Sequence, residues 1–320
     1  MFHLLNKNLN LQLFLLAILS GWAAWTVFAR MTLMPTEGSM LLFQYIARLW
    51  EWSPLATRIL VLSSVLLTVV GVIQHCNRHH FADNRTFMPG IFLLLLLNTG
   101  KFLHTLSPAL LTNFFIALIM MIYSPGDQSA KIKDNLVTFG LTIAIATLLD
   151  ISAFGIVLFL VLMVIVNNVS PLKDTVILIV SLAIPYLYAF SIAFMCNSLP
   201  AFLQSWRDLA VFIPVRQFLT MRIIDYVAMA YFLFITIVLI IRGKQLLDNK
   251  LIVIRQAFIN LHLMMISMFL FVWLGFVPFP MATVYFVLPL SIYMTVAVLP
   301  KRHRFIIDFL IISLCILLWV

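Results

Sequence analysis

Residues 87–123 read FMPGIFLLLLLNTGKFLHTLSPALLTNFFIALIMMIY, and this stretch decides the fold class. Its 37 residues contain two basic side chains, Lys101 and His104, and no acidic one. One membrane crossing needs about 20 apolar residues, so two crossings and a turn need roughly 44. The stretch is too long to cross once and too short to cross comfortably twice. It therefore predicts a tight helical hairpin with its tip drawn towards the lipid.

A second stretch, residues 136–168, has the same character over 33 residues, and its only charge is Asp150. A charge near a hairpin tip is costly in lipid and is usually paired or functional. In the topology given below both tips face outwards, so we predict a contact between Lys101 and Asp150 that forms the floor of a polar cavity. The alternative is that the two tips reach separately to the membrane surface.

The composition indicates an all-α, polytopic membrane protein. Hydrophobic residues make up 64% of the chain, charged residues 10%, and the mean hydropathy is +1.12, whereas soluble proteins carry about 25% charged residues. The net charge of +9 would suggest a nucleic-acid partner in a soluble protein. Here the basic residues fall in short loops, where they set orientation, so the expected partners are membrane lipids and not nucleic acid.

Eleven apolar segments predict about eleven membrane helices in one integral-membrane domain, residues 1–320. They are 11–29, 55–73, 87–103, 108–123, 136–149, 151–166, 176–195, 226–241, 257–277, 281–299 and 305–320. After residue 123, ten Lys and Arg residues fall inside and three outside when the N-terminus is cytoplasmic, which fits the positive-inside rule. We expect the C-terminus outside and interpret the first segment as a span, not a cleaved signal peptide.

The first outer loop contains a candidate catalytic acid, Glu37, at the mouth of the first span. Residues 40–52 follow as a predicted interfacial amphipathic helix, with Arg48 on its polar face as a candidate substrate-binding residue. A carboxylate in this place could act as a general base or bind a cation beside a lipid-borne substrate. The alternative is a solvated acid that stabilises the start of the helix.

The second outer loop, residues 196–225, carries three arginines against the usual charge bias: Arg207, Arg216 and Arg222. Guanidinium groups suit bidentate recognition of phosphate, so these arginines are candidate ligands of a polyprenyl phosphate. The alternative is pairing with Asp208 and Asp225, or with ordinary lipid headgroups.

Histidines and a cysteine gather at the inner end of the second span: His75, Cys76, His79 and His80. Their i,i+4 spacing could hold a metal. Because no partner carboxylate stands out, we interpret the group as a basic membrane anchor and predict no metal site there.

The layout resembles the membrane core of the GT-C glycosyltransferases, which use polyprenyl-linked sugars. The matching features are Pro35-Thr-Glu37, the helix 40–52 and the segment 139–165, within a core of about residues 10–195 that precedes C-terminal helices in 196–320. The resemblance implies action on, or binding of, a polyprenyl-phosphate-linked glycan at the outer face of the membrane.

The resemblance implies that Glu37 is a general base or the ligand of a divalent cation, which would be the cofactor. Arg207, Arg216 and Lys101 hold the phosphate, with His104 and Asp150 nearby. The chain also resembles an uncharacterised family of bacterial envelope membrane proteins, which implies a bacterial inner membrane. The alternative function is a non-enzymatic scaffold or assembly subunit of an envelope complex. A third hypothesis is a small-solute transporter with Lys101 and Asp150 at its site.

Overall fold

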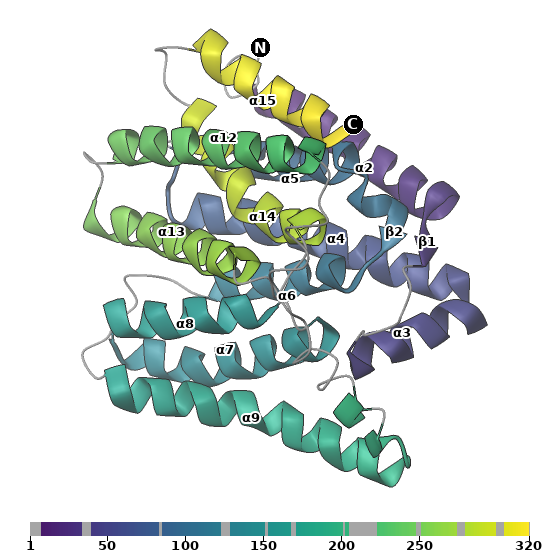
Figure 1. The fold of residues 1–320 in the computed structure, drawn as a ribbon. Helices are drawn as coiled ribbons and strands as arrows, with labels where there is room; N and C mark the ends of the chain where they lie inside the picture. The colour runs from purple at the N-terminus through teal and green to yellow at the C-terminus, as the bar shows by residue number, and fades with distance from the viewer. Residues whose placement is uncertain are drawn as a thin grey trace.

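The computed structural model describes residues 8–33, 40–82, 85–122, 129–150, 153–167, 171–200, 202–204, 223–247, 251–273, 279–298 and 304–319. These residues form α-helices, one 3-10 helix (η1) and one pair of very short strands (Figure 1). In chain order they are α2 Leu9–Arg30, β1 Thr32–Leu33, α3 Leu41–Trp52, α4 Pro54–Arg78, α5 Met88–Thr99, η1 Phe102–His104, β2 Thr105–Leu106, α6 Pro108–Ile122, α7 Ser129–Leu149, α8 Phe154–Asn167, α9 Pro171–Met195, α12 Ile223–Leu247, α13 Ile252–Trp273, α14 Phe279–Val298 and α15 Arg304–Trp319. The predicted all-α class is confirmed.

Each apolar stretch forms two helices joined by a turn, as predicted, but the hairpins are open and not tight. The first turns between α5 and α6, and the second turns at Asp150 between α7 and α8. Helix α5 packs mainly against α14, α2 and α4, and α7 packs mainly against α9 and α6. The 12 residues of α5 rise only about 18 Å, well short of a hydrocarbon core of about 30 Å.

The largest error in the predicted boundaries is at α7, which begins at Ser129 and not at residue 136, and α5 ends at Thr99 and not at residue 103. Residues 129–135 are mostly polar, so a search for apolar segments does not include them. They are helical nevertheless, because alanine and lysine are strong helix formers.

The start of α5 is fixed by a buried glutamine from α2. The Gln12 side-chain oxygen accepts from the Thr86 hydroxyl at 3.1 Å and from the Phe87 amide at 2.7 Å. Asn77, near the end of α4, bonds both backbone groups of Thr86. The bond to Phe87 satisfies the backbone N–H of the residue that caps α5, which the start of a helix leaves without an internal partner. Pro89 supplies the fixed φ that suits the first turn.

Both hairpin tips lie at one end of the bundle, which we call the α3 end. Strand β1, which follows α2, pairs with β2 at the first tip. At the second tip, Leu148 packs with Leu42 of α3 and with Ala193 near the end of α9. Figure 1 shows β1, β2 and α3 together at the right edge of the molecule. The expectation that the two tips face the same way is confirmed.

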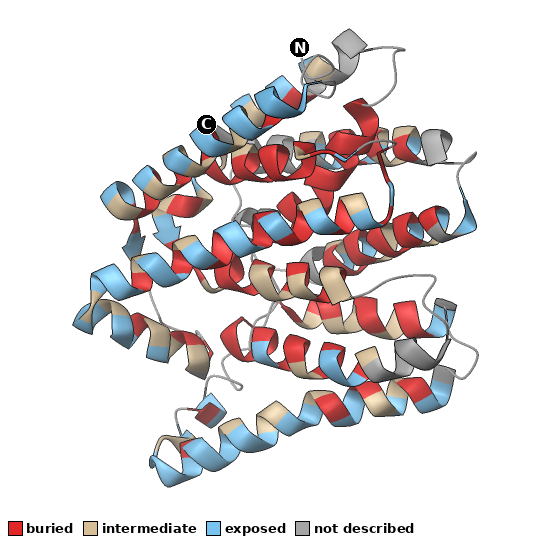
Figure 2. Ribbon diagram, turned by 180° about the vertical axis from the view of Figure 1, so that it is seen from behind, coloured by how far each residue is buried: buried red, intermediate tan, exposed pale blue. Residues whose placement is uncertain are grey.

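The core of the bundle is built around α14. Every residue from Val284 to Val298 is buried, and α14 packs against α5, α6, α12 and α13. The Asn113 amide of α6 donates to the Val284 carbonyl oxygen at 2.8 Å. By contrast α9 lies at the edge, with most of its outer surface exposed (Figure 2). Packing, and not a difference in hydrophobicity, therefore decides which of the apolar helices are central and which are peripheral.

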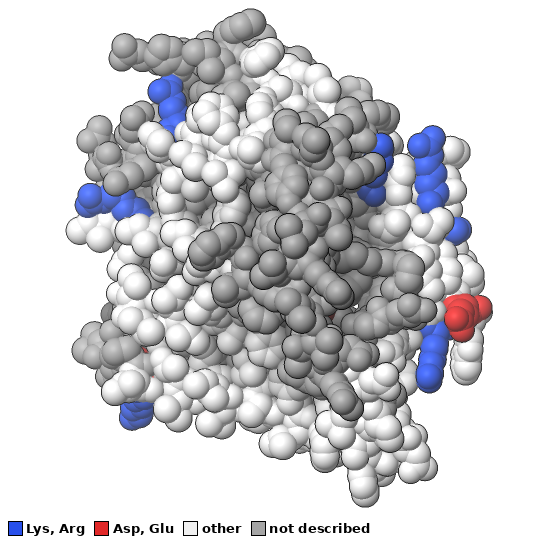
Figure 3. Space-filling model, in the orientation of Figure 1, with Lys and Arg blue, Asp and Glu red and all other residues white. Residues whose placement is uncertain are grey.

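Three of the described helices are long and apolar enough to cross a membrane: Leu9–Arg30, Pro54–Arg78 and Leu172–Met195. Seven more stretches form shorter apolar helices of 10–17 residues. Lys and Arg side chains gather at the left and right edges of Figure 3, and the described surface between them is mostly uncharged in this view. The right edge is the α3 end, so charge is concentrated where the helices end.

Candidate functional site

The α3 end is organised by the short parallel strand pair. Thr32 of β1 faces Thr105 of β2, and Leu33 faces Leu106. The Thr32 hydroxyl also donates to the His104 carbonyl oxygen, 3.3 Å away. Because β1 continues from α2 and β2 continues from η1, this pairing ties the C-terminal end of α2 to the tip of the first hairpin.

Lys101 lies at this tip in an uncommon backbone conformation. Its φ is 55°, in the left-handed region that favours glycine. The glycine comes one residue earlier, where a Cβ on Gly100 would lie 2.2 Å from the Phe102 ring. A non-glycine residue in the left-handed region costs on the order of 1–3 kcal/mol, and such residues cluster at functional sites. The exposed side chain of Lys101 is therefore held at the α3 end despite that cost.

The pKa of His104 reflects both partial burial and the positive charge at the tip of the first hairpin. Partial burial lowers the pKa of its imidazole from the ordinary 6.5, and the positive charges of Arg30 and Lys101 lower this pKa further. Arg30 ends α2, and the other two residues belong to the hairpin tip. We call these three residues, Arg30, Lys101 and His104, the cationic tip. Basic groups that repel one another are stabilised by an anion placed between them.

Helix α3 lies at the same end of the molecule as the cationic tip (Figure 1) and carries aromatic and basic side chains. The guanidinium of the exposed Arg48 lies 5.7 Å from the centre of the Tyr45 ring, and that of Arg58 lies 5.3 Å from the Trp50 ring. Trp52 is 88% exposed. The predicted amphipathic helix is confirmed, and exposed aromatic residues beside cations are typical of a helix in the membrane interface.

Asp150 is buried, with 9% of its surface exposed. One of its carboxylate oxygens accepts a hydrogen bond from the hydroxyl of Tyr285, in α14. The suggestion that this tip reaches separately to the membrane surface is therefore wrong for Asp150, because packing against α14 covers it. The sequence did not predict the role of Tyr285. Nothing in its apolar segment distinguishes a tyrosine that bonds to a residue 135 positions away from one that only packs in the core.

Several predicted site residues lie outside the described residues. They are Glu37, Arg207, Arg216 and Arg222. Among the remaining candidates, the structure brings Lys101 and His104 together through their electrostatic contact. The predicted contact between Lys101 and Asp150 stays a prediction.

The histidine group at the end of α4 is more enclosed than an anchor should be. His75 and His79 are each 4% exposed and Cys76 is fully buried, whereas His80 is exposed. The His75 and His79 ring centres are 4.4 Å apart. The interpretation as a basic membrane anchor is therefore wrong for three of the four residues. Within the described ranges, no group of three or more His, Cys, Asp or Glu side chains is placed to hold a metal ion.

Comparison of the chain with protein-family models, with curated proteins and with solved structures gives no match.

Proposed function

We propose that this chain is a multi-pass membrane protein whose α3 end binds the phosphate of a membrane-borne anion. The observation that carries the proposal is the cationic tip, in which α2 and the first hairpin bring Arg30, Lys101 and His104 together. Arg48, on α3, is exposed at the same end of the molecule and is a further candidate for this binding. Cations beside exposed aromatic residues suit a lipid phosphate, because the rings occupy the interface while the charges meet the headgroup.

The specific ligand that we propose is a polyprenyl-phosphate-linked glycan at the outer face of a bacterial inner membrane. The proposal assumes that eleven segments cross the membrane, that the N-terminus is cytoplasmic and that the α3 end lies on the outer side. Glu37 follows β1 in the chain and is the proposed base or cation ligand, and the arginines of residues 196–225 are proposed to join the phosphate site. In this arrangement the GT-C-like layout accounts for both short hairpins, since their tips form part of the substrate groove.

Binding to lipid nanodiscs tests the phosphate site. Lys101→Gln and Arg30→Gln should each weaken binding of a polyprenyl phosphate by roughly 1.5–3 kcal/mol, the scale of a charged hydrogen bond. Arg85→Gln is the matched control, because Arg85 lies beyond α4, away from the α3 end. A polyprenol without phosphate should bind more weakly than the polyprenyl phosphate, and Lys101→Gln should not change its affinity. Equal losses for Lys101→Gln and Arg85→Gln would remove the cationic tip from the proposal.

A catalytic role is separated from binding by one further variant. Glu37→Gln keeps the shape of the side chain but cannot take a proton as a carboxylate does. Loss of glycan transfer with unchanged phosphate binding supports an enzyme, and an unchanged activity in both assays supports a protein that only binds.

A scaffold of an envelope complex is the second candidate, and α9 is the observation that favours it. Only 17% of its apolar window is buried, compared with 44% for α4. Exposed aromatic residues, including Tyr188 at 69% and Phe194 at 67%, give it a surface that could receive a partner helix. Crosslinking from position 188 in membranes distinguishes the two, because lipid contact alone gives no discrete protein adduct.

A further inference from the structure

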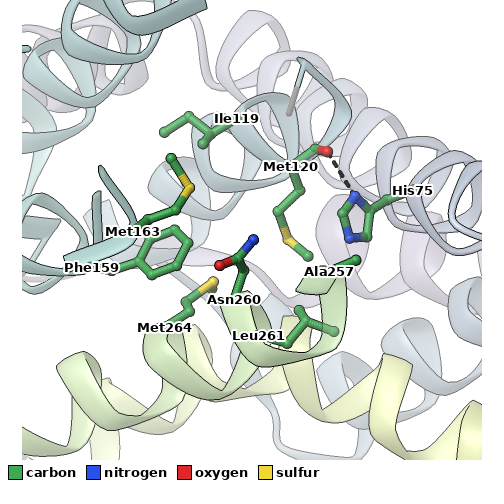
Figure 4. Close-up of a pocket in the computed structure, with 9 residues that line it drawn as sticks. All are labelled: His75, Ile119, Met120, Phe159, Met163, Ala257, Asn260, Leu261 and Met264. Atoms are coloured by element: carbon green, nitrogen blue, oxygen red, sulfur yellow. Dashed lines mark hydrogen bonds between the residues drawn. The ribbon is translucent and has the colours of Figure 1, made fainter. Parts of the chain in front are cut away.

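A small cavity lies between four helices at the end of the molecule opposite α3. Its walls come from α4, α6, α8 and α13 (Figure 4). It offers about 20 Å³ to the centre of a water-sized sphere, which is enough for one water molecule or one ion. All of its lining residues are buried, so an occupant would be enclosed by protein.

The imidazole of His75 contributes an unused lone pair to this cavity. Its Nδ1 lies 2.7 Å from the Met120 carbonyl oxygen, and since a carbonyl can only accept, Nδ1 carries the proton. A neutral imidazole then leaves Nε2 unprotonated. This Nε2 is buried and has no hydrogen-bond partner. The backbone bond fixes the orientation of the ring in the way that carbonyl groups fix metal-binding histidines.

Three methionines surround the same space. Met120, Met163 and Met264 come from α6, α8 and α13, and each is at most 6% exposed. Figure 4 shows their side chains and the Asn260 amide around one cavity, with His75 at its edge. The other lining side chains are aliphatic or aromatic. The potential donor atoms that line the cavity are thus one imidazole nitrogen, three thioether sulfurs and an amide.

This donor set discriminates between possible occupants. Hard cations such as Mg²⁺ and Ca²⁺ need several oxygen ligands, and the cavity has no carboxylate. A bound anion needs hydrogen-bond donors or a positive charge, whereas the unprotonated Nε2 of His75 offers a lone pair. Thioether and imidazole ligands suit Cu(I), a soft ion of single charge. A single charge also reduces the cost of placing an ion among neutral ligands.

We propose that His75, Met120, Met163 and Met264 form a binding site for one Cu(I) ion. The site is independent of the cationic tip, because it lies at the other end of α4 and uses none of the same residues. A methionine or histidine that only fills the core would need no shared cavity and would leave no imidazole nitrogen without a partner.

Titration of the purified full chain in detergent micelles tests the site. Cu(I) is kept reduced and is competed by a coloured chelator, and Ag(I) is used as a redox-inert substitute. The background carries Cys196→Ser, because Cys196 is the exposed thiol and thiols also bind Cu(I). We expect one equivalent of Cu(I), with sulfur and nitrogen neighbours in the X-ray absorption spectrum.

Methionine-to-leucine changes keep side-chain volume and remove the donor. Met163→Leu and Met264→Leu should each weaken Cu(I) binding by about tenfold or more, the range typical of changes at metal sites. Met268→Leu is the matched control, because Met268 is buried in α13 without lining the cavity. The proposal is overturned if the unchanged protein binds no stoichiometric Cu(I), or if Met268→Leu weakens binding as much as Met264→Leu. It is also overturned if Cys76→Ala abolishes binding that Met264→Leu leaves intact.

Discussion

Two tyrosines of α14 make a matched pair at the scale of single residues. Tyr285 donates to the buried Asp150 carboxylate, whereas the buried hydroxyl of Tyr293 has no hydrogen-bond partner. Tyr285→Phe should lower the free energy of unfolding by about 1–3 kcal/mol, since it removes a partner from a buried charge. Tyr293→Phe should be neutral or stabilising. Denaturant unfolding in micelles measures both, and a larger loss for Tyr293→Phe would contradict the assignment.

His104 gives a pH-dependent prediction. Its pKa is lowered in the folded protein, so as the pH falls below 6.5 the unfolded chain takes up this proton before the folded one. Stability from this group is therefore present above pH 6.5 and is lost as the pH falls towards the folded pKa. Lys101→Gln should raise the pKa of His104, because it removes one of the repelling charges. NMR titration of the imidazole measures the shift, and Arg85→Gln should leave it unchanged.

An anion bound at the cationic tip should itself raise the pKa of His104. Binding of a phosphate lipid should therefore strengthen as the pH is lowered from about 7.5 towards 6, and His104→Gln should remove this dependence while Lys101 and Arg30 retain part of the affinity. Affinities measured at several pH values in nanodiscs check this expectation. A pH dependence that survives His104→Gln would assign it to another group.

At the scale of elements, glycines show which helix contacts are close. A Cβ on Gly140 of α7 would lie 2.0 Å from the Ser181 hydroxyl oxygen and 2.9 Å from the Leu178 carbonyl oxygen of α9. Gly140→Ala should therefore separate α7 from α9 and destabilise the fold by about 1–3 kcal/mol. Gly21→Ala in α2 is the control, because nothing lies within 4 Å of its added Cβ.

The control should stabilise the protein by about 0.5–1 kcal/mol, the difference in helix propensity between alanine and glycine. Thermal unfolding of both variants in the same detergent compares them directly. If Gly140→Ala were as stable as Gly21→Ala, the close approach of α7 and α9 would be incorrect.

At the scale of the whole molecule, the distribution of Lys and Arg along the sequence predicts a topology. The expected eleven crossings place α3 and the end of α15 outside and the residues around Arg304 inside. Alkaline phosphatase fused after Val320 should be active, and a fluorescent protein fused after Arg304 should fluoresce, because each reporter works on one side of the membrane only. Phosphatase activity at Arg304 alone would invert the C-terminal part. This prediction rests on the excess of Lys and Arg on the cytoplasmic side after residue 123.

The sequence by itself determined the features that depend on local composition. The length of residues 87–123 was enough to predict two short helices joined by a turn, because hydrocarbon thickness sets how many residues a crossing needs, but not that α5 and α6 pack against other helices. The alternation of polar and apolar residues predicted α3, and the confirmed helix begins at Leu41, one residue after the start of the predicted range 40–52. The candidate site was predictable only in part, since Lys101 and His104 are neighbours in the chain but Arg30 joins them through β1 and β2.

Only the tertiary structure decided which distant residues meet. Thr32 pairs with Thr105, Asp150 binds Tyr285, and the His75 imidazole faces methionines from other helices. In a chain that is 64% hydrophobic, nearly every helix is apolar on all sides, so hydrophobic periodicity does not mark the face that packs inside. Close packing of side chains and the need to satisfy buried polar groups select these partners. Both conditions depend on segments far apart in the sequence.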